Sequence, residues 1–362
     1  MSTLLDVAPN APAYAVDRRA LIPQAWLATE TEDQFHLYNP ALIAFRGRRL
    51  FAYRLDSGRK GPAHRRIAIC ALDEQWRVIP GSVVPFSDTI AEGGSRHYDP
   101  RFFVYGDRLF IHYNNCFQTR PNQIFLVEVD ADTLWAKGTA RPLLLEGPRY
   151  EIEKNWMLFE HEGEVLAVYT IAPHVILRVA LTETGPIVCT PTFSTNWDVT
   201  AYAQRYGDLR GGAPPIRYGD LYLSVFHSHR VVGALRHLLP FFPERLTRTW
   251  PRYPAGAIRR IRIRCNQRRY YGGLYAFAAT PPFQPFWLAH EPILRPEFEQ
   301  TRQQPRWIDL TSELAVYPTG ALLHDEQRLF VSYGVHEERC CIRCIDLTQI
   351  VKTKTPASFT TT

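Results

Sequence analysis

The chain has 362 residues, of which 46% are apolar and 22% charged; this is close to the composition of ordinary globular proteins and excludes a disordered, collagen-like or coiled-coil chain. Proline (28) outnumbers glycine (21), methionine is scarce (2) and aromatic residues make up 13%, a profile typical of many short strands joined by rigid loops. The net charge of +6 comes mainly from arginine, because only five of the 42 basic residues are lysine.

The strongest pattern along the chain is a repeat that occurs five times: a polar or small-residue start, an apolar strand, a turn and a second strand that ends in an aromatic region. The copies read NPALIAFRGRRLFAYR from Asn39, YDPRFFVYGDRLFIHY from Tyr98, KNWMLFEHEGEVLAVY from Lys154, GGAPPIRYGDLYLSVFH from Gly211 and PTGALLHDEQRLFVSYG from Pro318. Each is typical of a β-hairpin. Four of the five turns carry a glycine, which can adopt the positive φ that tight hairpins require.

The spacing of the copies predicts the architecture. Four of them begin at residues 39, 98, 154 and 211, which are 59, 56 and 57 residues apart, so each period has room for about four strands. We therefore predict an all-β, five-bladed β-propeller forming one domain over residues 1–350, followed by a polar tail at 351–362. The last gap of 107 residues predicts an insertion at about 229–256, between the fourth and fifth repeats, that is partly helical up to Pro240. In a closed ring the innermost strand starts surround a central funnel.

Positive charge is concentrated in one part of the chain. The stretch Arg245–Arg269 contains nine arginines and no acidic residue, so its charge alone exceeds that of the whole chain. Because the guanidinium fork matches phosphate oxygens, a phosphate-bearing partner or an anionic surface is one interpretation, and a solvated face is the other. A nucleic-acid partner is not expected, because the stretch shows no reading helix, RNA-binding consensus or zinc finger.

The seven cysteines indicate a reducing environment. Their number is odd, most are isolated and no secretory signal peptide is recognisable before them, so we expect a cytoplasmic protein. Cys341 and Cys344 form a single Cys-x-x-Cys pair in an alternating run typical of a strand, whereas a zinc site normally takes a second pair; no metal is expected. Residues 270–290 lack charged side chains, but their two glycines and three prolines argue against a membrane-spanning helix.

Polar residues occupy the ends of the predicted hairpins, where a closed ring would bring them together. They are Asn39, Asp99 and Arg101, Lys154 and Asn155, His227 and His229, and Tyr333, His336 and Glu337. A site with a carboxylate, cations, an amide and aromatic walls suits sugar hydroxyls and an anionic nucleophile or leaving group. The alternative is that these residues only form turns and ion pairs at strand ends.

The repeat starts carry five short motifs in a fixed order: Asn-Pro at 39–40, Asp-Pro-Arg at 99–101, Lys-Asn-Trp at 154–156, Gly-Gly-Ala-Pro-Pro at 211–215 and Pro-Thr-Gly at 318–320. In kind, order and spacing they resemble the motifs of glycoside hydrolase family 130 (GH130), the five-bladed β-mannoside phosphorylases and hydrolases. One such motif would be a weak signal, whereas five in register make the resemblance of fold strong. The resemblance implies an enzyme that acts on β-mannosidic or related glycosidic bonds by inversion, through phosphorolysis or hydrolysis.

The resemblance also implies roles for single residues. Asp99 matches the catalytic general acid, which in the phosphorylases acts through a sugar hydroxyl. The positions that match the family's substrate and phosphate contacts are Asn39, Arg54, Lys154, His227 and Glu337. Further candidates for substrate binding are Asn155, His174, Tyr333 and Arg101, the last of which we expect to brace the carboxylate or its loop. No cofactor is implied; inorganic phosphate is the candidate co-substrate, and an oligosaccharide or glycan is the expected partner.

Departures from the family leave the reaction open. Tyr98 replaces an acidic residue, Ser228 replaces a glycine and Glu337 replaces an aspartate. Two alternatives therefore stand beside the glycosidase or phosphorylase: a glycosyltransferase that uses a nucleotide sugar or sugar phosphate on the same scaffold, and a glycan-binding propeller without catalysis. The arginine-rich stretch favours the transferase, because it could hold a diphosphate.

Overall fold

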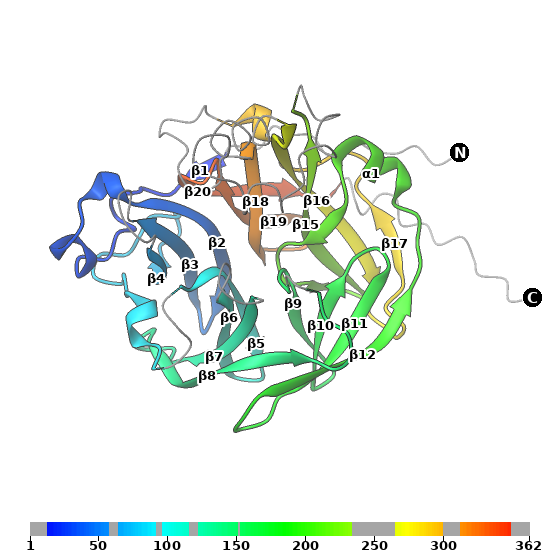
Figure 1. Cartoon of the computed structure of the whole chain (residues 1–362), viewed down its shortest axis with the longest axis horizontal. Helices are drawn as coiled ribbons and strands as arrows, with labels where there is room; N and C mark the ends of the chain where they lie inside the picture. Colours follow the sequence, from blue (N-terminus) through cyan, green and yellow to red (C-terminus); the bar gives the residue numbers. More distant parts are fainter. Residues whose placement is uncertain are drawn as a thin grey trace, which may run out of the picture.

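The computed structural model describes residues 13–57, 64–91, 96–115, 122–150, 153–233, 265–299 and 312–348. The described strands fall into five groups along the chain, each built around one predicted hairpin, which we call strand groups 1 to 5. The groups are arranged around a common centre (Figure 1). Within the described ranges the helical elements are α1 (Thr200–Tyr206) and 3-10 turns at Trp26–Ala28, Glu32–Gln34, Phe86–Thr89 and Pro296–Phe298. The prediction of a mostly β chain is confirmed.

The groups follow one another in chain order. Group 1 is β2 (His36–Phe45), β3 (Arg48–Ser57) and β4 (His64–Leu72), and group 2 is β5 (Tyr98–Tyr105), β6 (Arg108–Asn115), β7 (Gln123–Val129) and β8 (Ala136–Leu145). Group 3 is β9 (Met157–His161), β10 (Glu164–Thr170), β11 (His174–Ala180) and β12 (Ile187–Thr195). Group 4 is β13 (Leu209–Gly211), β14 (Ile216–Tyr218), β15 (Leu221–Val231), β16 (Arg268–Ala278) and β17 (Pro285–Leu288). Group 5 is β18 (Ser312–Leu323), β19 (Arg328–Val335), β20 (Arg339–Asp346) and β1 (Ala13–Ala15).

Pairing is antiparallel inside each group and parallel between some groups. The parallel pairs β8–β12 and β16–β18 join groups 2 and 3 and groups 4 and 5 into larger sheets. Strand β1 pairs with β20, so the sheet of group 5 contains segments from both ends of the described chain. The sequence pattern did not predict this pairing, because β1 is only three residues long and lies outside every repeat.

The predicted hairpin turns are present, with one shift. Gly47 and Gly163 have φ values of 72° and 79° in the turns of groups 1 and 3. In groups 2 and 4 the strand continues one residue further than expected, so the turns begin at Gly106 and Gly219, again with positive φ. Glycine is favoured at these positions because it takes a left-handed conformation without a Cβ clash.

The predicted insertion lies mostly outside the described residues. Residues 229–231 continue β15 as a strand, and Arg268 and Arg269 begin β16. The expected helix up to Pro240, most of the arginine-rich stretch and the tail at 351–362 fall outside the described ranges. Most of the uncharged stretch 270–290 forms β16 and β17. No helix in the described part of the chain is long and apolar enough to cross a membrane.

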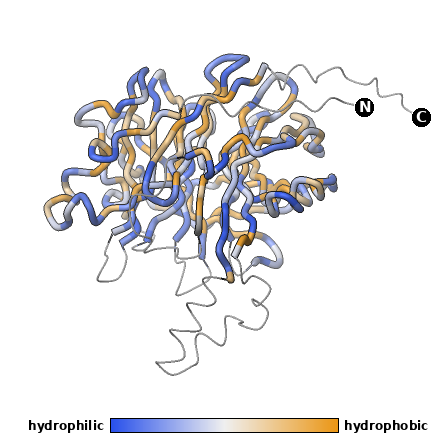
Figure 2. Tube along the Cα trace, turned by 90° about the horizontal axis from the view of Figure 1, so that it is seen from above, coloured by the Kyte–Doolittle hydropathy of each residue, from blue (hydrophilic) through white to orange (hydrophobic). Residues whose placement is uncertain are grey.

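Apolar side chains fill the spaces between neighbouring strand groups. Among the described residues, separate clusters of buried side chains join groups 1 and 2, 2 and 3, 3 and 4, and 4 and 5. A further cluster joins group 5 back to group 1, and within it the rings of Trp76 and Phe330 lie 4.6 Å apart. Hydrophobic segments, orange in Figure 2, accordingly run through the body of the molecule. Each group is held by two neighbours, so the innermost strands are fixed around the centre.

The inner strands are kinked where the polar motifs begin. Asn39 and Asp99 adopt left-handed backbone conformations with φ of 51° and 56°, and Asn155 does so with φ of 67°. The hairpin register shifts at the first two positions. Asn and Asp tolerate this conformation better than other residues with a side chain, and such bulges redirect the side chains next to them. Three repeats therefore use the same local device at equivalent positions.

Two glycines let the strand starts approach one another. A Cβ on Gly211 would lie 1.9 Å from the carbonyl oxygen of Asn155, and a Cβ on Gly320 would lie 2.1 Å from the amide nitrogen of Leu42. The first contact joins groups 4 and 3, and the second joins groups 5 and 1. A larger residue at either position would push the strand starts apart.

Candidate active site

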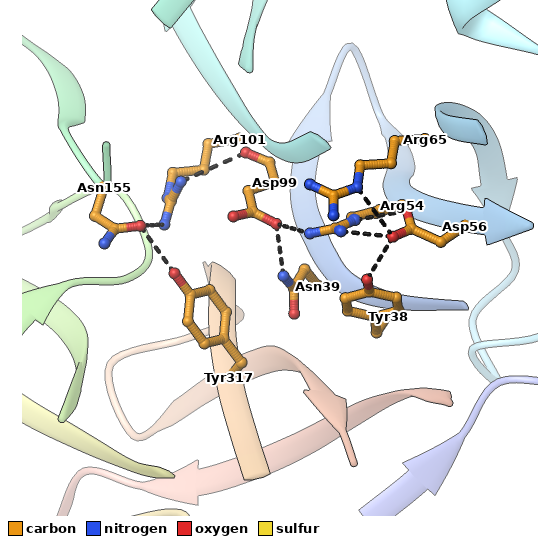
Figure 3. Close-up of polar contacts among 9 residues, drawn as sticks. All are labelled: Tyr38, Asn39, Arg54, Asp56, Arg65, Asp99, Arg101, Asn155 and Tyr317. Carbon is orange, nitrogen blue, oxygen red and sulfur yellow. Dashed lines mark hydrogen bonds and ion pairs between the residues drawn. The ribbon is translucent and has the colours of Figure 1, made fainter. Parts of the chain in front are cut away.

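The kinks at Asn39 and Asp99 bring the two side chains together between strand groups 1 and 2 (Figure 3). Asp99 is 5% exposed, and its Oδ1 accepts hydrogen bonds from Nδ2 of Asn39 at 2.7 Å and from Nη1 of Arg54 at 3.0 Å. No described residue donates a hydrogen bond to its Oδ2. One oxygen of the carboxylate is thus fixed by the protein, and the other accepts no hydrogen bond from the described residues.

Arg54 lies between two carboxylates. Its Nε and Nη2 donate to Oδ1 and Oδ2 of Asp56 at 2.7 and 2.6 Å, while Nη1 donates to Asp99. Asp56 is fully buried and also accepts from the hydroxyl of Tyr38 at 2.8 Å, and Nε of Arg65 lies 3.6 Å from its Oδ2 (Figure 3). The bidentate pair fixes the plane of the guanidinium, so it determines which nitrogen reaches Asp99.

Sequence reasoning missed Asp56, Tyr38 and Arg65. A usable signal was present for Asp56: it lies two residues after Arg54 on a strand, and residues two apart point to the same face. No comparable signal marked Tyr38 or Arg65, because their contacts with Asp56 depend on the pairing of three strands.

Arg101 connects three strand groups. It is 1% exposed, its Nε donates to the carbonyl oxygen of Gly212 at 2.6 Å, and its Nη2 donates to Oδ1 of Asn155 at 3.2 Å. The same amide oxygen accepts a hydrogen bond from the hydroxyl of Tyr317 at 2.8 Å. Arg101 and Asn155 therefore hold the strand starts of groups 2, 3 and 4 together, and Tyr317 adds group 5 (Figure 3). Tyr317 was not among the residues predicted for the site.

Lys154 lies near Asp99, and a second cation, Arg210, lies near Lys154. Lys154, half-buried, interacts electrostatically with Asp99 and with Arg210. Neither Lys154 nor Arg210 forms a hydrogen bond or an ion pair within 4 Å with any described residue. Arg210 pairs with His227 across β13 and β15, so the two side chains share one face of the sheet.

His227 completes this side of the site. It is 2% exposed, its Nδ1 lies 3.0 Å from the carbonyl oxygen of Gly211, and its ring lies 4.2 Å from that of Tyr317. Burial, together with the nearby charge of Lys154, holds the pKa of His227 well below its ordinary value, so the imidazole is neutral. A neutral ring whose Nδ1–H donates to a carbonyl presents Nε2 as an acceptor.

The cations also determine the charge of Asp99. Burial alone raises the pKa of this carboxyl, but the charges of Arg54 and Lys154, helped by the hydrogen bond from Asn39, outweigh it and hold the pKa below its ordinary value. Asp99 is therefore ionised at neutral pH. Burial lowers the pKa of Lys154, and the attraction of Asp99 offsets only part of that effect. The site carries a surplus of positive charge and is suited to an anion.

Seven of the predicted site residues thus form one connected group: Asn39, Arg54, Asp99, Arg101, Lys154, Asn155 and His227. Glu337 lies near it, because its charge acts on the buried hydroxyl of Tyr38. Glu337 is half-buried and has a left-handed backbone with φ of 63°. It therefore belongs to the Arg54 side of the site.

The structure places His174 elsewhere. Its ring is fully buried between groups 3 and 4, with ring centroids 4.9 Å from Phe277 and 5.8 Å from Tyr275. Burial lowers the pKa of His174 to about 3. It contacts none of the residues around Asp99, so the expected role in substrate binding is corrected to that of a core residue.

Tyr333 is also a packing residue. It is fully buried in the apolar cluster between groups 4 and 5, and its hydroxyl donates to Oε1 of Glu299 at 2.9 Å. Nη2 of Arg343 donates to the same oxygen at 2.8 Å. The hydroxyl is therefore engaged inside the fold, and the predicted substrate contact is corrected.

No group of three or more His, Cys, Asp or Glu side chains in the described ranges is placed to hold a metal ion. Cys341 and Cys344 lie on β20 as free thiols.

No protein-family model and no curated protein matches this chain, but solved structures match over most of its length. A candidate glycosidase from Bacteroides thetaiotaomicron is 16% identical, with a TM-score of 0.59 over 94% of this chain and 95% of that one. A mannose phosphorylase from Leishmania mexicana, solved with a phosphate ion, is 11% identical, with a TM-score of 0.51 over 89% and 86% of the two chains. A structure from the GH130 family of mannoside phosphorylases, which contains glycoside hydrolases that target β-1,2-mannosidic linkages, is 11% identical, with a TM-score of 0.54 over 86% and 84%.

At 11–16% identity these are likenesses of fold. They confirm the resemblance found in the five sequence motifs: this chain has a GH130-type fold.

Proposed function

We propose that this chain is a carbohydrate-active enzyme that forms or cleaves a β-mannosidic or related glycosidic bond with inversion, using phosphate or a sugar phosphate as the second reactant. The proposed scaffold is a five-bladed β-propeller with one blade for each strand group. One observation carries the proposal: a buried carboxylate, Asp99, has one oxygen without a hydrogen bond from the described residues and lies near Lys154, which in turn lies near Arg210, and neither cation has an ion-pair partner among the described residues. A phosphate group would supply the missing negative charge.

In this proposal Asp99 exchanges the proton. During cleavage a phosphate oxygen attacks the anomeric carbon, the glycosidic C–O bond breaks, and the departing oxygen takes a proton from Asp99, directly or through a sugar hydroxyl. During synthesis the acceptor hydroxyl gives its proton to Asp99, its oxygen attacks the anomeric carbon and phosphate leaves. Asn39 and Arg54 occupy Oδ1, so Oδ2 is assigned to the exchange. A single displacement inverts the anomeric centre.

Lys154, Arg210 and His227 are the proposed phosphate contacts. The two cations would each bind phosphate oxygens, and the neutral His227 ring would accept a hydrogen bond from a phosphate or sugar hydroxyl through Nε2. Bound phosphate would offset the charge of Lys154, which now keeps the pKa of Asp99 low. Phosphate binding would therefore raise the pKa of Asp99 and help it to carry the proton that cleavage needs.

We propose phosphate rather than water as the nucleophile partly because Asp56, the carboxylate joined to Asp99 through Arg54, is engaged. An inverting hydrolase uses one carboxylate as acid and a second as base to activate water. Both oxygens of Asp56, the carboxylate joined to Asp99 through Arg54, are bonded to that guanidinium. Asp56 is therefore poorly placed to act as a base, whereas phosphate needs none.

The second candidate is a glycosyltransferase that uses a nucleotide sugar. It is favoured by the lowered pKa of Asp99, because an ionised carboxylate is ready to accept a proton from an acceptor hydroxyl. The two candidates share the synthetic half-reaction and differ in the leaving group.

The experiment that tests the proposal incubates the purified chain with mannose 1-phosphate and a panel of sugar acceptors, and separately with β-mannobioses and phosphate. A parallel arm replaces mannose 1-phosphate by a nucleotide sugar. Asp99→Asn removes the proton-exchanging group and should lower the rate by about 100-fold or more. Asp107→Asn is the matched control, because this aspartate lies in the turn of the same hairpin and its side chain is 90% exposed.

The arms separate the candidates. Turnover of mannose 1-phosphate or of a β-mannobiose with phosphate supports a phosphorylase, and turnover of the nucleotide sugar alone supports a transferase. Binding of sugars without turnover in any arm would identify a glycan-binding propeller. Wild-type rates for Asp99→Asn in a productive arm would remove Asp99 from the chemistry.

A further inference from the structure

Two tyrosines outside the described site lie on the same side of the ring as Asp99. Strand β5 begins at the Asp99 kink. Strands β5 to β8 are antiparallel to one another in turn, so β8 ends on the side of the molecule on which β5 begins. Residues 146–150 follow β8 and residues 153–156 precede β9, and Tyr150 is the last residue of the first of these segments. Strand β10 ends on the same side, because Val168 near its end pairs with Met157 at the start of β9. Tyr169 follows Val168.

A buried carboxylate fixes both tyrosines. Glu153 is 3% exposed, and its Oε1 accepts hydrogen bonds from the amide of Tyr150 at 2.6 Å and from the hydroxyl of Tyr169 at 3.2 Å. Its Oε2 accepts from Nε1 of Trp156 at 3.3 Å, and its own amide donates to Oδ1 of Asn122 at 2.8 Å. We call Glu153 and the side chains around it, Tyr150, Trp156 and Tyr169, the Glu153 hub. Glu153 immediately precedes Lys154, so the backbone of this hub is continuous with that of the proposed phosphate site.

The hub presents an aromatic face to solvent. The rings of Tyr150 and Tyr169 are stacked, with centroids 6.2 Å apart and planes 20° apart, and Trp156 supports Tyr169 edge-on at 5.5 Å. Tyr150 is nevertheless 66% exposed. Arg149 beside it is held by the carbonyl oxygen of Asn122 at 2.7 Å and supplies N–H donors at the same rim. A rigid, exposed ring with polar neighbours is the arrangement that binds a ligand having both apolar and hydroxyl-bearing faces.

We propose that Tyr150 is a sugar-binding platform, which takes an outer pyranose ring of an oligosaccharide whose reacting end lies at Asp99. The inference rests on the proposed function and adds the substrate class: chains longer than a disaccharide. Tyr150 lies four positions before Lys154, so their Cα atoms are at most about 14 Å apart, a span that an oligosaccharide can bridge. The C–H face of the sugar packs on Tyr150, and its hydroxyls accept hydrogen bonds from Arg149.

The kinetic test compares short and long acceptors. Tyr150→Ala should raise KM for β-mannotriose and β-mannotetraose by about two- to tenfold, with kcat unchanged and with KM for mannose unchanged. Tyr150→Phe keeps the ring and should behave like wild type. Trp135→Ala is the control for loss of an exposed aromatic residue, since Trp135 is 58% exposed and lies in the β7–β8 turn at the opposite end of the strands.

A binding measurement keeps the inference separate from the proposed chemistry. Calorimetric titration of Asp99→Asn and of Asp99→Asn/Tyr150→Ala with the same oligosaccharides measures affinity without turnover. Weaker binding of the longer chains by the double variant supports the platform, even if no reaction is found. Three results would overturn the inference. The single and double variants could bind the longer chains equally well, or the double variant could lose the same affinity for mannose as for the longer chains. The third is that neither variant binds any oligosaccharide.

Discussion

The two sides of Asp99 differ in how their charges are balanced. On the side of strand group 1, Arg54 donates hydrogen bonds to Asp56 and Asp99. Asp56 also accepts a hydrogen bond from the hydroxyl of Tyr38 and forms an ion pair with Arg65. On the side of groups 3 and 4, Lys154 and Arg210 form neither a hydrogen bond nor an ion pair with a described residue.

The contrast separates a scaffold from a binding surface. A buried charge that is fully hydrogen-bonded holds its partners in one geometry, and removing one member leaves the others uncompensated. A cation that forms no direct ion pair or hydrogen bond contributes little to folding, and its N–H groups are available to a ligand. The first side should therefore control stability, and the second should control the binding of anions.

The largest effect is expected for Asp56→Asn. It leaves Arg54 buried without its bidentate partner, so the free energy of unfolding should fall by about 3–5 kcal/mol. Urea unfolding followed by circular dichroism measures the change. Asp107→Asn, at an exposed turn, should stay within about 0.5 kcal/mol of wild type. Equal stabilities for the two variants would break the distinction between the two sides.

In contrast to Asp56→Asn, Lys154→Met should weaken phosphate binding without lowering stability. Burial disfavours the charge of Lys154, so its removal should leave the free energy of unfolding unchanged or slightly higher. The affinity for inorganic phosphate should fall by about 10- to 100-fold, because a charge-assisted contact is lost. Calorimetric titration measures this, with Lys137→Met as the control on an exposed lysine. A variant that unfolds easily yet binds phosphate normally would reverse our assignment.

Two buried histidines sharpen the comparison, because His227 lies in the site and His174 in the core. The pKa of His174 is about 3 in the folded chain and about 6.5 when unfolded. Only the unfolded chain takes up the proton between these values, so stability is lost as pH falls below about 6.5. Between pH 7 and pH 5 this residue should cost about 2 kcal/mol.

His174→Phe should remove that part of the pH dependence without changing phosphate affinity. Unfolding at pH 7 and pH 5 gives the difference, and His64→Phe, at an exposed position, should leave the pH dependence as in wild type. An unchanged pH dependence in His174→Phe would show that His174 is not held neutral by burial. A change in phosphate affinity would show that His174 contributes to the proposed phosphate site.

The smallest effect is expected for Tyr38→Phe. It removes one hydrogen bond to Asp56 and keeps the ring that lies 4.6 Å from the Arg54 guanidinium. The free energy of unfolding should fall by about 1–1.5 kcal/mol, measured as for Asp56→Asn, with phosphate affinity unchanged. A larger loss of phosphate affinity than of stability would show that the first side also binds the anion.

Much of the fold could be predicted because each repeat carries its own signals. A turn glycine such as Gly163 between two apolar strands marks a hairpin without information from elsewhere in the chain. The recurrence of polar residues at the repeat starts then placed Asn39, Asp99 and Lys154 in one site, because a ring brings equivalent positions together.

The remaining features depend on contacts between repeats, which no local pattern records. Tyr317 reaches Asn155 from group 5 to group 3. His174 and Tyr333 were among the residues predicted to bind substrate, Tyr333 because it lies at the end of the fifth hairpin. Their surroundings are set by neighbouring groups, whose aromatic and apolar side chains bury them.

The central claim is that Asp99 exchanges a proton during a single inverting displacement. Proton NMR of the product formed from α-mannose 1-phosphate and an acceptor tests it most directly. We predict a β-mannoside in the wild-type reaction and a rate at least about 100-fold lower for Asp99→Asn. An α-mannoside, or equal rates for the two proteins, would contradict it.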